Sequence, residues 1–353
     1  MSPRITFVTT ASPAPMGMQV YEEEVISRAP HELDGDAEVT RTILRSLRSP
    51  LAGTTRVPAW LLHDAPSAAR RAAGAMLYGR ADVVHRMSLA QPPARVPEII
   101  TVHDTVAWHF PDEAAPERHA AQEARRAAAV IAPSQFSADD VAERLGLDRV
   151  IAIPNGVDQA FFDAEALPAD TLAGLGVTGR FVLHAGGSAR RKNLKALAEA
   201  WPRVRSVHPD VTLVLCGPPA YRRSYHFAEM EGAVLTGMLP AHLLPGLVAS
   251  AEVVVIPSLH EGFGLPALEA MAAGTQVVAS NRTALPEVVG DAGILVEPDA
   301  EGIAAGLVHA LDGDGGARRR ALGRSRAQGY TWAASAHAHA DVWRAVLGGR
   351  VPS

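Results

Sequence analysis

The chain has 353 residues, of which 48% are hydrophobic and 20% charged, so it can bury a large core and is not a disordered polymer. Its 33 basic and 38 acidic residues leave a net charge of −5, and only 5% of residues are aromatic, which argues against a nucleic-acid-binding surface. A single cysteine, Cys216, excludes internal disulfides and cysteine-cluster metal sites. No apolar run approaches the roughly 18 residues of a membrane span, and the N-terminus lacks a signal peptide pattern. We therefore expect a cytoplasmic protein without a transmembrane helix.

Short β-branched segments alternate with longer segments of helical period, which is typical of βαβ units and a parallel sheet. In the first half, strands are expected at 5–9, 39–44, 83–85, 99–103, 130–132 and 150–153. The clearest helices between them are expected at 20–27, 67–77, 117–128 and 138–144.

The same alternation begins again after a Pro-Asn-Gly-Val-Asp break at 154–158. Strands are expected at 181–184, 212–216, 233–236, 253–256, 276–279 and 293–296. Helices are expected at 193–207, 241–249, 266–273 and 300–311. The sequence therefore predicts an α/β protein with two doubly wound domains.

Two further helices are expected at the end of the chain, an Arg-rich one at 317–327 and a final one at 332–347. The final helix carries the apolar residues Trp332, Trp343 and Val346, which we expect to be buried against another part of the protein. Because the second domain already has its own helices, we expect the final helix to return to the first domain. The predicted domains are residues 1–158 together with 331–353, and residues 159–330.

The segment 260–274 follows a predicted strand and opens a helix at Pro266, a residue favoured in the first helical turn. The backbone N–H groups of Gly262, Gly264 and Leu265 are expected to be unpaired at this helix start. Such groups at the carboxyl edge of a parallel sheet bind anions.

Two glutamates accompany that helix start, Glu261 in the loop and Glu269 in the helix. One carboxylate can reach a sugar and the other a ribose diol. The alternative interpretation is an ordinary helix start with a terminal Gly274. It does not explain the two glycines that flank Phe263, which we expect to be exposed in the loop, so we favour a site for a phosphate-containing ligand.

A basic turn follows the first strand of the second half. Gly186 and Gly187 allow the backbone to approach a ligand, and Arg191 and Lys192 offer cations for a diphosphate. The alternative is a solvated charged run in which Asn193 caps the next helix.

Weaker signals come from the first half. His103 ends a strand at the carboxyl edge, where a structural histidine is as plausible as a ligand contact. Gly17 follows the first strand in a glycine turn that specifies little. The pair His337 and His339 does not share a helix face, so no metal site is predicted.

Together these residues resemble the retaining GT-B glycosyltransferases, specifically family four of the nucleotide-sugar transferases, over nearly the whole chain. Residues 261–280 are similar to the E-x7-E motif of that family, with Gln276 where a proline is usual. Residues 186–193 are similar to a GTxxPRKN signature, from which Gly187 and Arg190 depart. The resemblance implies the GT-B fold, with two Rossmann-like domains and a deep interdomain cleft.

The resemblance also implies roles for individual residues. Glu269 would hold the donor ribose and Glu261 the hydroxyls of the transferred sugar, while Arg191 and Lys192 would neutralise the diphosphate leaving group. His103 would contact the sugar from the first domain. The other implied donor-binding positions lie in glycine turns and at the helix start: Gly17, Gly186, Gly187, Gly262, Phe263, Gly264 and Leu265.

The function expected from this resemblance is retaining, metal-independent transfer of a hexosyl group, with a mannosyl-type donor favoured, from a nucleoside-diphosphate sugar to a hydroxyl. The acceptor is a glycan, a lipid-linked glycan or a small molecule, peripheral membrane contact stays open, and no cofactor is implied. One alternative is a UDP-sugar donor used on a secondary metabolite. Others are an epimerase or a phosphorylase-like enzyme, and a nucleotide-sugar-binding protein without transferase activity.

Overall fold

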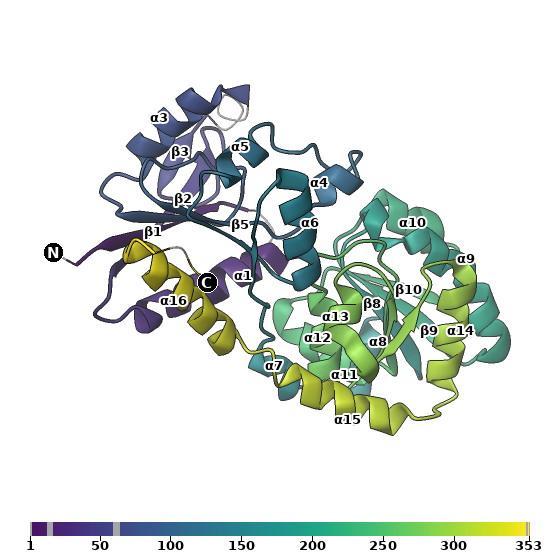
Figure 1. Cartoon of the computed structure of the whole chain (residues 1–353). Coiled ribbons are helices and arrows are strands. Elements are labelled where there is room, and N and C mark those ends of the chain that lie inside the picture. Colours follow the sequence, from purple (N-terminus) through teal and green to yellow (C-terminus); the bar gives the residue numbers. More distant parts are fainter. Residues whose placement is uncertain (1, 13–16, 59–63, 351, 353) are drawn as a thin grey trace. The chain divides into compact units, whose positions relative to one another are not determined.

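The computed structural model describes residues 2–12, 17–58, 64–350 and 352 (Figure 1). The chain forms two compact units: unit 1 runs to Gly156 and resumes at Trp332, and unit 2 is Val157–Thr331. The divisions predicted at 158 and 331 lie within two residues of these points.

Unit 1 is built on a parallel sheet with the strand order β3-β2-β1-β4-β5-β6-β7. Its strands are β1 (Arg4–Thr10), β2 (Glu38–Ser46), β3 (Thr55–Val57), β4 (Val83–Arg86), β5 (Glu98–Thr101), β6 (Ala129–Ala132) and β7 (Ile151–Ala152). Its helices are α1 (Gly17–Glu32), α3 (Ser67–Leu77), α4 (Val106–His109), α5 (Ala120–Ala124), α6 (Gln135–Leu145) and α16 (Trp332–Leu347).

All six strands expected in the first half are present, whereas β3 was not predicted because three residues at a sheet edge carry no apolar pattern. The helix expected at 117–128 is only the five-residue α5. Glu123, near its end, is buried in ion pairs with Arg70 and Arg86, and the chain then turns into β6.

Unit 2 has a six-stranded parallel sheet with the order β10-β9-β8-β11-β12-β13. The strands are β8 (Phe181–Ala185), β9 (Thr212–Cys216), β10 (Ala233–Gly237), β11 (Val253–Ile256), β12 (Gln276–Ser280) and β13 (Ile294–Val296). The α-helices are α7 (Gln159–Phe162), α8 (Ala169–Gly174), α9 (Leu194–Val207), α10 (Tyr221–Phe227), α11 (Leu244–Ser250), α12 (Leu265–Ala272), α13 (Leu285–Val289), α14 (Ala300–Leu311) and α15 (Gly316–Ala327). The 3-10 helices are η1 (Arg190–Lys192), η2 (Ala241–Leu243) and η3 (Gly290–Ala292).

The sheet of unit 2 is covered on both faces, which explains why its strands read as continuous apolar runs. In β8, Val182 packs with Trp201 of α9 and Leu307 of α14. Its neighbour Leu183 packs on the opposite face with Leu268 of α12. Successive strand residues point to opposite faces, so two apolar layers hold the strand ends in place.

The arginines of α15 bind the ends of other helices. Arg324 donates to Ala272 O at 3.0 Å and to Phe162 O at 2.6 Å, at the last residues of α12 and α7. Arg326 donates to Val288 O at 2.7 Å, in α13. Carbonyls at the end of a helix lack partners within that helix. The arginines of α15 supply such partners and so join α15 to α7, α12 and α13.

Helix α16 packs on α1 in unit 1 through a buried chain of hydrogen bonds. Tyr21 OH lies 2.7 Å from His339 Nε2 and 3.0 Å from Thr101 Oγ1. His85 Nε2 lies 2.9 Å from the same Oγ1, and Trp343 Nε1 donates to His85 Nδ1 at 3.1 Å. These residues place the final helix in unit 1.

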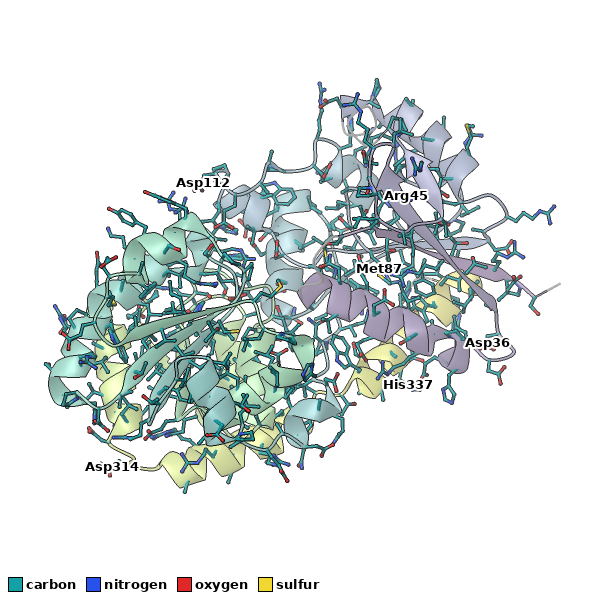
Figure 2. The ribbon with its side chains drawn as sticks, turned by 180° about the vertical axis from the view of Figure 1, so that it is seen from behind. Asp36, Arg45, Met87, Asp112, Asp314 and His337 are labelled. Atoms are coloured by element: carbon teal, nitrogen blue, oxygen red, sulfur yellow. The ribbon has the colours of Figure 1, made fainter. Side chains whose placement is uncertain are left out.

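Charged residues border this helix pair at the surface. His337 Nδ1 lies 3.2 Å from Glu32 Oε2, and Arg344 Nε donates to Asp36 Oδ2 at 2.7 Å. His337 and Asp36 mark the outer sides of α16 and of the turn after α1 (Figure 2). On α16, His337 thus faces solvent, whereas Trp332, Ser335, His339 and Trp343 are buried.

Candidate active site

The two sequence segments that predicted a ligand site meet at the carboxyl edge of the sheet in unit 2. One segment follows β8 and the other follows β11, and these two strands are neighbours at the centre of the sheet. The next strands after β8, β9 and β10, lie on one side of this pair, and the strands after β11 lie on the other side. Open α/β sheets bind ligands at such a switch point. Leu259 N donates to Arg191 O at 2.7 Å, which joins the two loops directly.

Asn193 holds the basic turn in place. It has a φ of 56°, and its Nδ2 donates to Pro257 O at 3.0 Å and to Pro298 O at 2.7 Å. Its side chain makes no capping hydrogen bond to α9. The alternative of a capping asparagine in a solvated run is therefore wrong, because the side chain ties the turn to two neighbouring loops.

Glu261 is a buried carboxylate that faces two cations. Lys192 Nζ lies 2.7 Å from its Oε1, Arg191 Nη1 lies 3.6 Å from its Oε2, and Ser258 Oγ donates to Oε1 at 2.6 Å. Burial raises the pKa of this carboxyl, but the positive charges of Lys192 and Arg191 outweigh burial and the pKa lies below its ordinary value. Glu261 is therefore ionised and fixed.

The backbone of Glu261 is held by a strained residue. Its N–H donates to Thr283 Oγ1 at 3.0 Å, and Thr283 has a φ of 53°. A β-branched residue rarely adopts a positive φ, and such strain gathers at functional sites. Neither Thr283 nor Ser258 was predicted, because a lone hydroxyl residue in a loop gives no sequence signal.

The start of α12 leaves backbone donors available. Among the described residues, no hydrogen bond reaches the N–H groups of Phe263, Gly264 or Leu265. Gly264 has a φ of 106°, and a Cβ there would lie 2.7 Å from Leu285 Cδ2. Only glycine fits this close turn, which aligns the unpaired donors at a helix N-terminus. Gly262 precedes them, half-buried in the same loop.

Phe263 is not the exposed loop residue expected from the sequence. Its side chain is buried and packs in the core of unit 2, with its ring 5.9 Å from that of Tyr330. The loop folds back so that the ring leaves solvent. Phe263 thus offers only its backbone to a ligand.

Glu269 differs from Glu261 because nothing neutralises it. It is half-buried in α12, and among the described residues no hydrogen bond or ion pair reaches its carboxylate. Burial, and next the negative charge of Asp158, raise its pKa to about 7. Because no donor in the described part of the chain reaches the carboxylate oxygens of Glu269, they can accept hydrogen bonds from a ligand.

Two of the predicted residues lie in unit 1, and all the others lie in unit 2. Gly17 is exposed at the first residue of α1, and Met16 beside it lies outside the described residues. His103 follows β5 and packs edge-on against Tyr21, with ring centroids 4.7 Å apart. Burial is the main cause that lowers the pKa of His103 to about 4, so it is neutral at pH 7.

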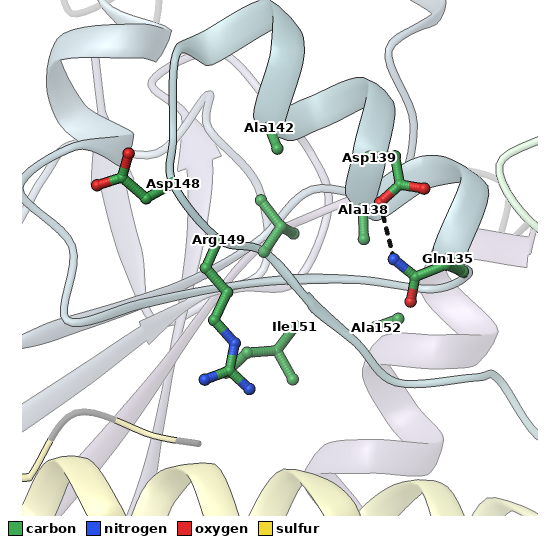
Figure 3. A pocket seen from close by; sticks show the side chains of 9 residues that line it. Gln135, Ala138, Asp139, Ala142, Asp148, Arg149, Ile151 and Ala152 are labelled. Carbon is green, nitrogen blue, oxygen red and sulfur yellow. Dashed lines mark hydrogen bonds between the residues drawn. The ribbon is translucent and has the colours of Figure 1, made fainter.

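A hollow of about 500 Å³ lies elsewhere, between α6 and β7 of unit 1 (Figure 3). Polar groups line it, including Arg149 and Gln135, whose amide donates to Asp139 at 2.7 Å. None of the predicted site residues lines this hollow. All of its lining residues belong to unit 1.

Two further properties concern the described part of the chain. It contains no group of three or more His, Cys, Asp or Glu side chains placed to hold a metal ion. Within the same residues, no helix combines the length and the apolar character needed to cross a bilayer.

Both units match known protein families. Residues 18–161 match Glycosyltransferase Family 4, and residues 179–313 match the family described as glycosyl transferases group 1. Glycogen synthase of Mycobacterium tuberculosis is 31% identical over 297 residues, which cover 76% of this chain and 70% of that protein.

O-antigen chain mannosyltransferase B of Escherichia coli is 35% identical over 164 residues, or 43% of this chain and 42% of the relative. A serotype-specific mannosyltransferase of the same organism is 32% identical over 231 residues, or 61% of this chain and 28% of the relative. The match thus spans less than half the length of these mannosyltransferases.

Solved structures share the fold over nearly the whole chain. Sucrose-phosphate synthase from Thermosynechococcus elongatus has a TM-score of 0.76 at 21% identity and covers 98% of this chain and 100% of its own. The Anabaena HepE protein in complex with UDP and glucose has a TM-score of 0.72 at 20% identity, covering 96% and 98%. Two parallel-sheet units and these likenesses identify the fold as GT-B, and the chain belongs to glycosyltransferase family four.

Proposed function

We propose that this protein is a retaining, metal-independent glycosyltransferase whose unit 2 binds a nucleoside-diphosphate sugar. The observation that carries the proposal is the arrangement around Glu261, where Lys192 and Arg191 face one buried carboxylate at a sheet switch point. The unpaired N–H groups that open α12 belong to the same loop as Glu261. A diphosphate fits cations and a helix N-terminus together.

The donor is held at two ends. The free carboxylate of Glu269 accepts hydrogen bonds from the ribose hydroxyls, and Glu261 accepts them from the hydroxyls of the sugar. Arg191, Lys192 and the backbone donors of Gly264 and Leu265 bind the diphosphate. Gly186 and Gly187 let the basic turn approach it closely.

In the reaction, the bond between the anomeric carbon and the phosphate oxygen breaks while a bond to the acceptor oxygen forms. The acceptor proton passes to the departing phosphate on the same face, which retains the anomeric configuration. Negative charge grows on the leaving diphosphate, and fixed cations and backbone donors stabilise it without reorganising. Lys192 and Arg191 therefore lower the barrier directly.

The transferred group is a hexosyl group, and the relatives named as mannosyltransferases favour a mannosyl group. The second candidate is a glucosyl donor, which relatives named glycogen synthase and alpha-maltose-1-phosphate synthase favour. The acceptor is a hydroxyl of a glycan, a lipid-linked glycan or a small molecule.

The test is release of nucleoside diphosphate from a panel of sugar nucleotides, with acceptor mixtures analysed by mass spectrometry. We expect one donor to be turned over with a product heavier by one hexose unit, and turnover to fall with Lys192→Ala. Binding of sugar nucleotides without turnover under any acceptor would favour the binding protein instead. No binding at all would reject both.

A further inference from the structure

Arg223, on α10, is a buried arginine without a carboxylate partner. Its exposed fraction is 3%, and no ion pair reaches it among the described residues. Its Nη1 donates to Pro218 O at 2.9 Å, its Nη2 donates to Gly186 O, and its buried Nε has no hydrogen-bond partner. The guanidinium therefore links the turn after β8 to the turn after β9.

These two turns are packed backbone against backbone. Gly186 N donates to Cys216 O at 3.0 Å. Gly217 has a φ of 141°, and a Cβ at that position would lie 2.1 Å from Gly186 O and 2.9 Å from Arg223 Nη2. A residue larger than glycine does not fit at position 217. Arg223 therefore donates to Gly186 O at a place where the two turns approach so closely that only glycine is possible.

Within the described part of the chain, no carboxylate forms an ion pair with Arg223. His184, in β8, is buried with no partner at its Nδ1. Burial, followed by the positive charges of Arg223 and Lys192, lowers its pKa to about 3, so it is neutral. Burying an unpaired cation is unfavourable. Stabilisation of the fold alone therefore does not explain an arginine at this position.

The geometry of the peptide bond shows what the arginine does. In a trans peptide, the C=O of one residue and the N–H of the next point in opposite directions, and the described residues contain no cis peptide. Because Arg223 holds the carbonyl of Gly186, the N–H of Gly187 points away from Arg223. Within the described residues, no hydrogen bond reaches that N–H.

We propose that Arg223 is a positioning residue that fixes the peptide between Gly186 and Gly187, so that the N–H of Gly187 is presented to the diphosphate of the donor. This inference rests on the proposed function. It adds a second backbone donor site, on the turn after β8, to the one at the start of α12. Arg223 itself does not touch the donor.

The test compares Arg223→Met and Arg223→Lys with Arg222→Met, which removes the exposed neighbouring arginine of the same helix. Affinities for a nucleoside diphosphate and for the matching nucleoside are measured by calorimetry. We expect Arg223→Met to lose about tenfold or more in affinity for the diphosphate and to keep its affinity for the nucleoside. Arg223→Lys restores part of the loss, because an ammonium can donate to Gly186 O, and Arg222→Met resembles the wild type.

Equal losses for diphosphate and nucleoside, or no loss for either, would overturn the inference. Amide hydrogen exchange without ligand provides a readout that does not need the donor: exchange of the Gly186 N–H, which donates to Cys216 O at 3.0 Å, should speed up in Arg223→Met and not in Arg222→Met. Unchanged exchange there also overturns the inference. Failure of the proposed function is distinguishable, because the wild type would then bind no nucleoside diphosphate at all.

Discussion

Lys192 Nζ lies 2.7 Å from Glu261 Oε1, and this ion pair joins the turn after β8 to the loop after β11. Both side chains are mostly buried, at 13% and 8% exposure. A buried ion pair stabilises little by itself, but removing one partner leaves a buried charge unpaired. In the proposed function, the binding of the donor and the local order of the site therefore depend on the same lysine.

Replacing Lys192 with alanine should weaken donor binding or turnover by about tenfold or more, which corresponds to about 1.4 kcal/mol. The physical reason is the loss of a cation from the proposed diphosphate site. Lys195→Ala is the matched control, because Lys195 is 75% exposed and pairs only loosely with Glu199, at 3.7 Å. Kinetics and titration that did not separate Lys192→Ala from Lys195→Ala would reject the site assignment.

Glu269 should give donor binding a pH dependence near neutrality. Its pKa is raised to about 7, so the carboxylate that we propose accepts ribose hydrogen bonds is lost as the pH falls from 8 to 6. Donor affinity of the wild type should fall over that interval. In Glu269→Gln the affinity should be lower at pH 8 and change less with pH, and a steep unchanged profile would contradict the role of Glu269.

The same carboxyl should lower the stability of the free protein at alkaline pH. Its folded pKa lies above the ordinary value of 4.5, so the folded state binds more protons between pH 4.5 and 7 and stability falls as the pH rises through that window. Glu269→Gln should therefore melt at a higher temperature than the wild type at pH 8 and show little gain at pH 5. A variant with no gain at pH 8 would argue against the buried, uncompensated carboxylate.

Turnover should survive an excess of EDTA. In the proposed mechanism, Arg191, Lys192 and the start of α12 supply the positive charge that a metal ion gives in other transferases. Initial rates with and without EDTA should agree. Complete loss of activity in EDTA that Mg²⁺ or Mn²⁺ restores would show that the mechanism needs a metal.

The buried histidines of unit 1 should make the protein sensitive to acid. Burial is the main cause that lowers the pKa of His339 to about 4, whereas the unfolded chain titrates near 6.5. The unfolded state therefore binds more protons between these values, and stability is present above pH 6.5 and is lost as the pH falls toward 4. The melting temperature of His339→Gln should depend less on pH in this interval than that of the wild type.

His337→Gln is the control for this acid effect, because His337 lies on the same helix with its side chain 67% exposed. Its melting temperature should follow the wild-type pH profile. Equal profiles for all three proteins would mean that the hydrogen bond between Tyr21 and His339 does not govern the acid response.

Much of the fold is predictable from the sequence because the strands are buried on both faces. Segments such as Val253–Ile256 form continuous β-branched runs that have no exposed side. The short β3 and the helix α10 are different, because β3 lies at an edge and α10 exposes Tyr221 and Tyr225. Neither has an apolar period that reveals it.

The site is predictable only in part. Glycine turns and acidic residues after neighbouring strands predict a shared sheet edge, as Lys192 and Glu261 demonstrate. The support of Glu261 by Thr283 and the link from Arg223 to Gly186 depend on loops that approach only in the folded protein. The burial of Phe263 likewise depends on a distant ring, so local sequence pointed to the wrong exposure.

Titration of the protein with nucleoside diphosphates in the presence of EDTA tests the central claim most directly. The account predicts that one of them binds with a stoichiometry of one, and that Lys192→Ala and Glu269→Ala each weaken this binding by about tenfold or more, whereas Lys195→Ala leaves it unchanged. Binding that both site variants retain at wild-type strength would contradict the account, and so would the absence of binding by the wild type.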